Sequence, residues 1–285
     1  MSFRRIRLGT PGYPDLLAAI PDPPPGIWLR GAAEPEILAR PSVAIVGARA
    51  CSSYGRSVAR TLGRELAAAG LVVVSGLARG IDGEAHRGAL EAGGVTVAVL
   101  GCGIDRDYPA AHRELAQRIG ERGLLVSEYE VGVEPAPWRF PARNRIIAGL
   151  CTATVVVEAR ERSGALITAD FALEDGREVM VVPGEITSAV SAGANALLRI
   201  GATPVTGTAD VLEAFGLELV TEPIAPPGEL GATLLVLLAD NPASIDELAR
   251  ATGATPGEIA AALIELELTG RVSEGDGVYR VTLAR

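Results

Sequence analysis

The sequence contains no lysine. All 26 basic side chains among its 285 residues are arginines, and 35 acidic residues leave a formal net charge of −9. An acidic protein has no overall electrostatic attraction for a polyanion. Binding to nucleic acid would therefore need a local cluster of arginines, backbone amides and hydroxyl groups.

Cysteines and long hydrophobic runs are also scarce. The three cysteines, Cys51, Cys102 and Cys151, lie far apart and form no Cys-x-x-Cys or Cys/His spacing, which argues against structural zinc and favours reduced thiols. No window approaches the roughly 18 uncharged apolar residues of a membrane helix, and the N-terminus lacks the apolar region of a signal peptide. We expect a cytoplasmic protein with no bound metal and no contact with a membrane.

Short apolar runs alternate with helical patterns over residues 41–216. The runs predict strands at residues 43–46, 71–74, 95–100, 124–127, 154–158 and 179–182. Helices are predicted between them, at residues 54–69, 81–92, 109–119, 166–174 and 194–199. This alternation is typical of the α/β class, with a parallel sheet covered by helices on both faces. Ligands of such sheets bind beyond the carboxyl ends of the strands.

The two ends of the chain differ from this pattern. Residues 1–40 are proline-rich and predict an irregular, extended arm that packs on the next domain through Trp28 and Leu29. Residues 217–229 contain three prolines and predict a linker. Residues 230–285 predict three helices followed by a β-hairpin, which is the arrangement of a small winged-helix domain.

This C-terminal domain is acidic. Residues 228–285 carry nine acidic residues and four arginines. The helix expected to serve as a recognition helix contains Glu258, Glu265 and Glu267 and no basic residue. Base readout and phosphate contact both favour positive charge. We therefore favour a protein-interaction or regulatory role for this domain over the reading of DNA.

The most informative segment runs from Ser75 to Leu90, directly after the strand predicted at residues 71–74. A glycine-rich turn that leads from a strand into a helix exposes backbone amides, and the helix dipole favours an anion there. Gly76 and Gly80 permit close approach to the backbone, and Arg79 adds a positive charge between them. The segment predicts a phosphate-binding loop.

Asp82 and His86 lie four residues apart in the same segment and share one face of its predicted helix. A His/Asp pair can perform general acid–base chemistry. No nucleophile or set of metal ligands accompanies them in the sequence. We therefore favour a structural role in which both residues frame the loop, and we predict no catalytic residue.

Other loops at predicted strand ends share this small and basic composition. One of them carries Arg49, and another interleaves three arginines with Trp138 and Phe140, a combination suited to holding phosphates and stacking on bases. The candidate DNA or phosphate contacts in these loops are Gly47, Arg49, Ser52, Tyr54, Gly55, Phe140, Arg143, Asn144, Arg145, Ser163, Gly164, Thr168, Gly184 and Asn195. We expect these loops to converge at one edge of the sheet.

Two enzymatic alternatives depend on motifs that the sequence lacks. A nicotinamide dinucleotide site needs Gly-x-Gly-x-x-Gly and an acidic residue at the end of the second strand. Here Arg49 stands at the place of the second glycine, and Ser75 ends that strand. A nucleoside-monophosphate phosphoribohydrolase carries Pro-Gly-Gly-x-Gly-Thr-x-x-Glu, and Glu185 stands at the place of its second glycine. The phosphoribohydrolase class remains the alternative to a DNA-binding protein.

Several segments together resemble the bacterial DNA processing protein A family (DprA, also called Smf). They are residues 44–49, 75–90, 101–105 with 108–109, 140–150, 163–169, and 182–184 with 191–195. The resemblance implies an extended Rossmann-like domain that binds and protects incoming single-stranded DNA in natural transformation. It further implies a homodimer that helps to load the RecA recombinase, with no catalytic activity and no cofactor. Residues 231–285 resemble the winged-helix domain of many members.

The sequence departs from the family at its basic residues. Ala142 and the general absence of lysine leave any lysine–phosphate contact of the family unfilled. Arg139, Arg143 and Arg145 are the candidates to compensate for it.

Overall fold

The computed structural model describes residues 3–217, 228–275 and 277–282. The chain divides into two compact units, Met1–Leu219 and Val220–Arg285. The predicted linker, residues 217–229, lies outside the described residues except at its two ends. Each unit is described by itself.

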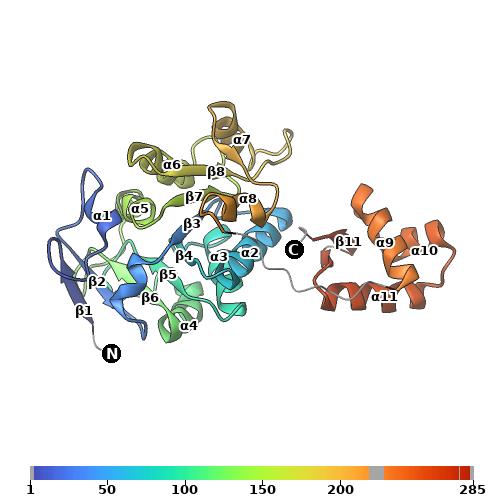
Figure 1. Cartoon of the computed structure of the whole chain (residues 1–285), viewed down its shortest axis with the longest axis horizontal. Coiled ribbons are helices and arrows are strands. Elements are labelled where there is room, and N and C mark those ends of the chain that lie inside the picture. Colours follow the sequence, from blue (N-terminus) through green and yellow to red (C-terminus); the bar gives the residue numbers. More distant parts are fainter. Residues whose placement is uncertain (1–2, 218–227, 276, 283–285) are drawn as a thin grey trace. The chain divides into compact units, whose positions relative to one another are not determined.

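The first unit is built on one sheet. Within the described residues it has nine strands in the order β1-β2-β6-β5-β4-β3-β7-β8-β9 (Figure 1). Seven of them run parallel to one another: β3 (Ser42–Val46), β4 (Val72–Ser75), β5 (Thr96–Val99), β6 (Leu124–Ser127), β7 (Ala153–Val156), β8 (Glu178–Val181) and β9 (Thr203–Pro204). The strand order reverses between β3 and β7, and a parallel sheet binds its ligand at such a switch point.

Helices cover both faces of the sheet (Figure 1). One face carries α2 (Ser53–Ala68), α3 (Ile81–Glu91) and α4 (Arg113–Arg122), and the other carries α5 (Arg139–Gly149), α6 (Gly164–Glu174) and α7 (Ala192–Arg199). A short helix, α8 (Thr208–Glu213), packs on α2. The central strands are buried along their whole length, which explains their continuous runs of valine and other apolar residues. The α/β prediction for this part of the chain is confirmed.

Residues 1–40 are not the irregular arm that their prolines predict. Strands β1 (Arg4–Arg7) and β2 (Gly26–Arg30) extend the sheet beyond β6, and a short helix α1 (Asp15–Ala18) lies between them in the chain. Strand β2 pairs antiparallel with β6, and β1 pairs antiparallel with β2. A 3-10 helix over Pro35–Ala39 follows. Leu29 pairs with Val126 and is fully buried. All prolines of this segment lie outside β2 and leave its ladder intact, so the apolar residues of this short strand outweigh the proline signal.

The second unit is a winged helix. Helices α9 (Glu229–Asp240), α10 (Ile245–Thr252) and α11 (Pro256–Leu268) precede the hairpin of β10 (Val272–Gly275) and β11 (Val278–Val281). Leu234, Leu248 and Leu263 contribute to its separate apolar core. Capping boxes begin α10 and α11, with each hydroxyl 2.7 Å from the glutamate three residues later.

Candidate nucleic-acid interface

Two adjoining cavities lie at the carboxyl edge of the sheet, beside the switch point. The first, of about 200 Å³, is called the Asn144 cavity and is lined by Val46, Gly47, Arg49, Ala78, Asp82, Phe140, Pro141, Arg143, Asn144, Ile147, Ser163, Gly164, Ala165 and Thr168. The second, of about 430 Å³, is called the Tyr108 cavity and is lined by Arg49, Ala50, Gly76, Ala78, Arg79, Gly101, Tyr108, Pro109, Phe140 and Arg143. Arg49 and Phe140 belong to both.

The loop after β3 is shaped by a carboxylate from the end of β7. Ser52 caps α2 by accepting a hydrogen bond from the Gly55 amide at 3.0 Å. The Ser52 amide donates to the Glu158 carboxylate at 2.9 Å, and the Ser52 hydroxyl donates to the same carboxylate. A Cβ atom at position 55 would collide with the Glu158 carboxylate, so the close packing here requires glycine. Ser52 and Gly55 therefore shape the loop and line neither cavity. The sequence analysis did not identify Glu158, although its position at a strand end was a signal.

The loop after β4 is held from within by Asp82. Its carboxylate accepts hydrogen bonds from the Gly76 amide at 3.1 Å and the Ala78 amide at 3.3 Å. Gly80 has φ +76°, and a Cβ there would collide with the backbone at Ala48 and Arg49. The two loops are thus locked together. Burial raises the pKa of Asp82, and the nearby Arg143 guanidinium opposes that shift.

His86 lies away from this loop, buried between α3 and the sheet. Its Nδ1 is 2.7 Å from the Thr96 hydroxyl, which itself donates to the Val73 carbonyl at 2.7 Å. The Thr96 hydroxyl oxygen therefore accepts a hydrogen bond from the protonated Nδ1 of His86. Burial lowers the pKa of His86 to about 3, so the imidazole is neutral at physiological pH. Among the described residues no hydrogen bond joins it to Asp82, and the pair is not arranged for acid–base chemistry.

Arg143 is buried rather than presented to a ligand. Its guanidinium donates to the carbonyls of Gly76, at 2.8 Å, and Val99. It thereby ties the ends of β4 and β5 to α5. Burial lowers its pKa to about 10, which leaves it charged at neutral pH, and Asp82 provides the neighbouring negative charge. The expectation of a freely accessible phosphate contact at Arg143 is corrected: the side chain lines the cavities but is engaged by the fold.

Arg145 is also engaged by the protein itself. It forms a bidentate ion pair with Glu128, at 2.8 and 2.7 Å, and a further ion pair with Asp22 at 3.1 Å. The hydrogen bonds to Glu128 raise its pKa. Arg145 lines neither cavity. The predicted arginine cluster is separated because residues 139–149 form a helix, α5, which the sequence analysis did not identify.

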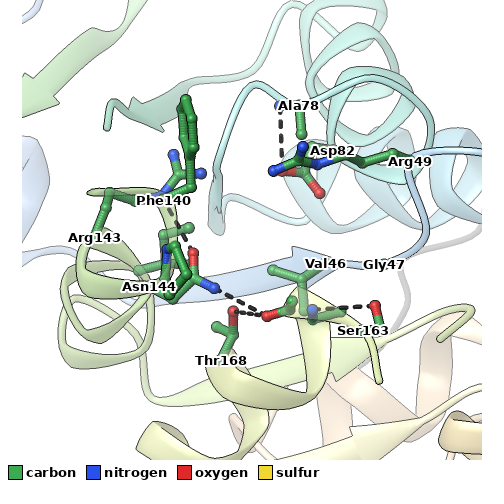
Figure 2. A pocket seen from close by; sticks show the side chains of 14 residues that line it. Val46, Gly47, Arg49, Ala78, Asp82, Phe140, Arg143, Asn144, Ser163 and Thr168 are labelled. Atoms are coloured by element: carbon green, nitrogen blue, oxygen red, sulfur yellow. Dashed lines mark hydrogen bonds between the residues drawn. The ribbon is translucent and has the colours of Figure 1, made fainter. Parts of the chain in front are cut away.

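Arg49 and Arg79 are the exposed arginines that line the two cavities. Among the described residues, neither forms a hydrogen bond or an ion pair. Arg49 lies opposite Phe140, Arg143 and Asn144 across the Asn144 cavity (Figure 2). Two further exposed arginines, Arg160 and Arg162, follow β7 at the same edge. Both belong to the small, basic loop that precedes Ser163 and were not among the predicted contacts, although they directly follow a predicted strand.

The aromatic side chains at the edge form a small cluster. The Phe140 ring stacks on Tyr108 with centroids 5.3 Å apart and an angle of 25° between the planes. The Arg49 guanidinium lies 5.6 Å from the Phe140 centroid. Trp138 is 63% exposed and lies outside both cavities, with the Arg139 guanidinium 4.7 Å from its ring.

The N-terminus of α6 forms the floor of the Asn144 cavity (Figure 2). Ser163 caps this helix by accepting from the Ala165 amide at 3.3 Å. The Asn144 side chain donates to the Gly164 carbonyl at 2.9 Å, and the buried Thr168 hydroxyl donates to the same carbonyl at 3.5 Å. The dipole of this eleven-residue helix favours an anion in the cavity.

Three more predicted contacts, Tyr54, Gly184 and Asn195, lie away from both cavities. Asn195 is paired with Gly184 through two hydrogen bonds, at 3.1 Å to its amide and 3.0 Å to its carbonyl. Tyr54 is 41% exposed, and its hydroxyl donates to the Pro183 carbonyl at 3.4 Å. These bonds brace the loop after β8, and none of the three residues lines either cavity.

The described part of the chain offers neither a site for a metal ion nor a helix that could span a membrane. Its histidine, cysteine and carboxylate side chains form no group of three that could hold a metal ion. In the ranges 3–217, 228–275 and 277–282, no helix has the length and apolar character needed to cross a bilayer.

Comparison with known proteins relates both units to one family. The family model of DNA recombination-mediator protein A matches residues 4–216, and that of the DprA winged helix domain matches residues 220–277. A putative DNA processing protein DprA from Mycobacterium tuberculosis is 43% identical over 271 residues, which are 90% of this chain and 69% of that protein. The DNA processing protein DprA of Streptococcus pneumoniae is 47% identical over 205 residues, 71% of each chain.

Solved structures agree with this relationship. The X-ray structure of DprA from Streptococcus pneumoniae superposes with a TM-score of 0.71 at 44% identity and covers 74% of each chain. DNA processing protein A from Helicobacter pylori superposes with a TM-score of 0.68 at 30% identity, over 75% of this chain and 95% of that one. In sequence and in fold, the chain belongs to the DNA recombination-mediator protein A family, DprA/Smf.

Proposed function

We propose that this protein binds single-stranded DNA, without regard to base sequence, along the carboxyl edge of its sheet. The observation that carries the proposal is the pair of unengaged guanidinium groups, Arg49 and Arg79, beside two cavities at the switch point. The Helicobacter pylori relative is described as having a single-stranded DNA binding mode. Single-stranded DNA suits this edge better than duplex DNA, because a base can enter a cavity or stack on an aromatic ring only when it is unpaired.

In this proposal the predicted site residues divide into two groups. Arg49 and Arg79 bind phosphates, together with the N-terminus of α6. The loops that contain Gly47, Gly76 and Gly80 position the two arginines, since the amides of Ala48, Gly76 and Ala78 already donate hydrogen bonds within the protein. The aromatic cluster that contains Phe140 and the stacked Tyr108 ring is the surface that a base would meet. The other predicted residues support these contacts by shaping the loops: Ser52, Tyr54, Gly55, Asp82, Arg143, Arg145, Gly184 and Asn195.

The family description, a recombination mediator, leads to a wider role. The protein protects incoming single strands in the cytoplasm, acts as a homodimer and passes the DNA to the RecA recombinase. It performs this role by binding and catalyses no reaction. Sedimentation of the purified chain tests the dimer, and retention of purified RecA by the immobilised protein tests the partner. A monomer at micromolar concentration, or no retention of RecA, contradicts the corresponding part.

The DNA-binding proposal is tested by fluorescence anisotropy with labelled oligonucleotides of one sequence, single-stranded and duplex. The wild-type protein is expected to prefer the single strand, and Arg49→Ala to weaken binding by about tenfold through the loss of a charged contact. Arg118→Ala is the matched control, because Arg118 is exposed on α4, outside both cavities. Equal affinity for duplex, or indifference to Arg49→Ala, contradicts the proposal.

The enzymatic alternative has a direct assay. A phosphoribohydrolase releases ribose 5-phosphate from AMP. We expect no release above the rate without protein, and turnover that is proportional to protein concentration contradicts the non-catalytic role.

A further inference from the structure

Tyr108 is an aromatic residue of the edge that the sequence analysis did not select. It lies in the loop that follows β5 and lines the Tyr108 cavity together with Arg49 and Arg79. Its side chain is 43% exposed, and its hydroxyl has no hydrogen-bond partner among the described residues. An exposed ring with a free polar end, in a cavity that two exposed arginines also line, has the features of a contact for a ligand that is both aromatic and anionic.

Phe140, in contrast, already has neighbours around its ring. Tyr108 stacks on it, and the Arg49 guanidinium lies over it. Its edge packs on the end of β5, where a Cβ at Gly101 would lie 2.7 Å from the Phe140 ring. A base that stacked directly on Phe140 would have to displace Tyr108 or Arg49. A base that stacked on Tyr108 would add to the existing stack without moving either.

We propose that Tyr108 is the platform on which the protein stacks an unpaired nucleobase, and that Phe140 supports it from behind. The inference rests on the proposed function, since it identifies the group that contacts the base at that same site. The cavity of about 430 Å³ lies within the range of roughly 300–1,000 Å³ found for small-molecule sites, which gives room for a base and its sugar. Arg49 and Arg79 line the same cavity and can bind the flanking phosphates.

The experiment uses the full chain and a single-stranded oligonucleotide that contains 2-aminopurine, whose fluorescence falls when it stacks on an aromatic ring. Wild-type protein and Tyr108→Phe, which both keep the ring, are expected to bind with affinities within twofold and to quench the probe. Tyr108→Leu keeps the apolar bulk against Phe140 but removes the ring. It is expected to bind about fivefold or more weakly, without quenching, because stacking one base on an aromatic side chain contributes at least that factor.

Two results overturn the inference. One is a Tyr108→Leu variant that binds and quenches like the wild type. The other is a Tyr108→Phe variant that loses as much affinity as Tyr108→Leu, because the hydroxyl rather than the ring would then be the contact.

A measurement on the wild-type protein does not depend on how the variants fold. Photo-crosslinking to an oligonucleotide that carries 5-iodouracil, followed by mass spectrometry, is expected to attach the base to Tyr108. Attachment to Phe140 or Trp138 alone contradicts the inference. Wild-type protein that binds no single strand overturns the proposed function itself, whereas binding that is insensitive to Tyr108 overturns only its role.

Discussion

At the residue scale, the buried pair of Arg143 and Asp82 organises the site. Arg143 donates to backbone carbonyls at the ends of two strands, and Asp82 accepts from the amides of the loop after β4. Each charge compensates the other, and both side chains are buried. The pair therefore holds the loop geometry while Arg49 and Arg79 remain exposed to a ligand.

Removing one member of this pair should reduce stability. Arg143→Met leaves the Asp82 carboxylate buried without its counter-charge, and we expect the free energy of unfolding to fall by about 3–5 kcal/mol. Urea unfolding followed by circular dichroism measures the change. Arg79→Ala is the exposed control, expected to change stability by less than about 0.5 kcal/mol. If Arg143→Met with Asp82→Asn is no more stable than Arg143→Met alone, the two charges do not act as a pair.

His86 gives the protein a defined pH dependence. Its pKa is about 3 in the folded state, against an ordinary value of 6.5. Between these two values the unfolded chain binds a proton that the folded protein does not, so this contribution to stability is lost as the pH falls. The slope is about 1.4 kcal/mol per pH unit. Urea unfolding of the wild type and of His86→Gln at pH 7, 6 and 5 gives the free energy of unfolding of each protein against pH. If the two proteins lose stability equally as the pH falls, His86 is not the source of the pH dependence.

At the element scale, the central strands and their helices follow directly from the sequence. Their apolar runs end in glycine or small residues, and burial on both faces leaves little ambiguity. Helix α5 was missed because its apolar residues, Ile146 and Ile147, follow a basic stretch that suggests an exposed loop. Without the helix, the sequence could not indicate that Arg143 is buried while Arg145 reaches Glu128.

The loop-shaping residues illustrate a second limit. Strand-end loops can be located from the sequence, but which polar side chains point to a ligand depends on neighbours far along the chain. Ser52 is engaged by Glu158, 106 residues away, and Tyr54 by the Pro183 carbonyl, 129 residues away. Such pairings arise from the strand order of the sheet, and local spacing does not encode that order.

The helix caps of the second unit permit a test confined to one element. Ser244→Ala removes the hydroxyl that closes the capping box of α10, and we expect the winged helix to lose about 1 kcal/mol of stability. Hydrogen exchange of the α10 amides measures this loss, with amides of the sheet as the internal reference. Single-strand affinity is expected to remain unchanged. A parallel loss of affinity contradicts a site confined to the first unit.

At the scale of the whole molecule, the charge distribution separates two roles. The chain is acidic overall, and residues 228–285 hold nine acidic residues against four arginines. We expect residues 1–219 alone to bind single-stranded DNA within about twofold of the full chain, because the proposed phosphate contacts all lie in the first unit. Anisotropy titration of the shortened chain measures this. If the shortened chain stays folded but no longer binds DNA, the winged helix takes a direct part in DNA binding.

The dependence of affinity on salt tests the central claim most directly, because it counts phosphate contacts. Titration of single-stranded DNA over a salt series is expected to give a linear log–log plot, with a slope of about −0.7 for each phosphate neutralised. Arg49→Ala and Arg79→Ala should each make the slope shallower by about 0.7, and Arg118→Ala should leave it unchanged. Parallel lines for all four proteins would show that neither Arg49 nor Arg79 contacts the DNA backbone, and would contradict this account of the site.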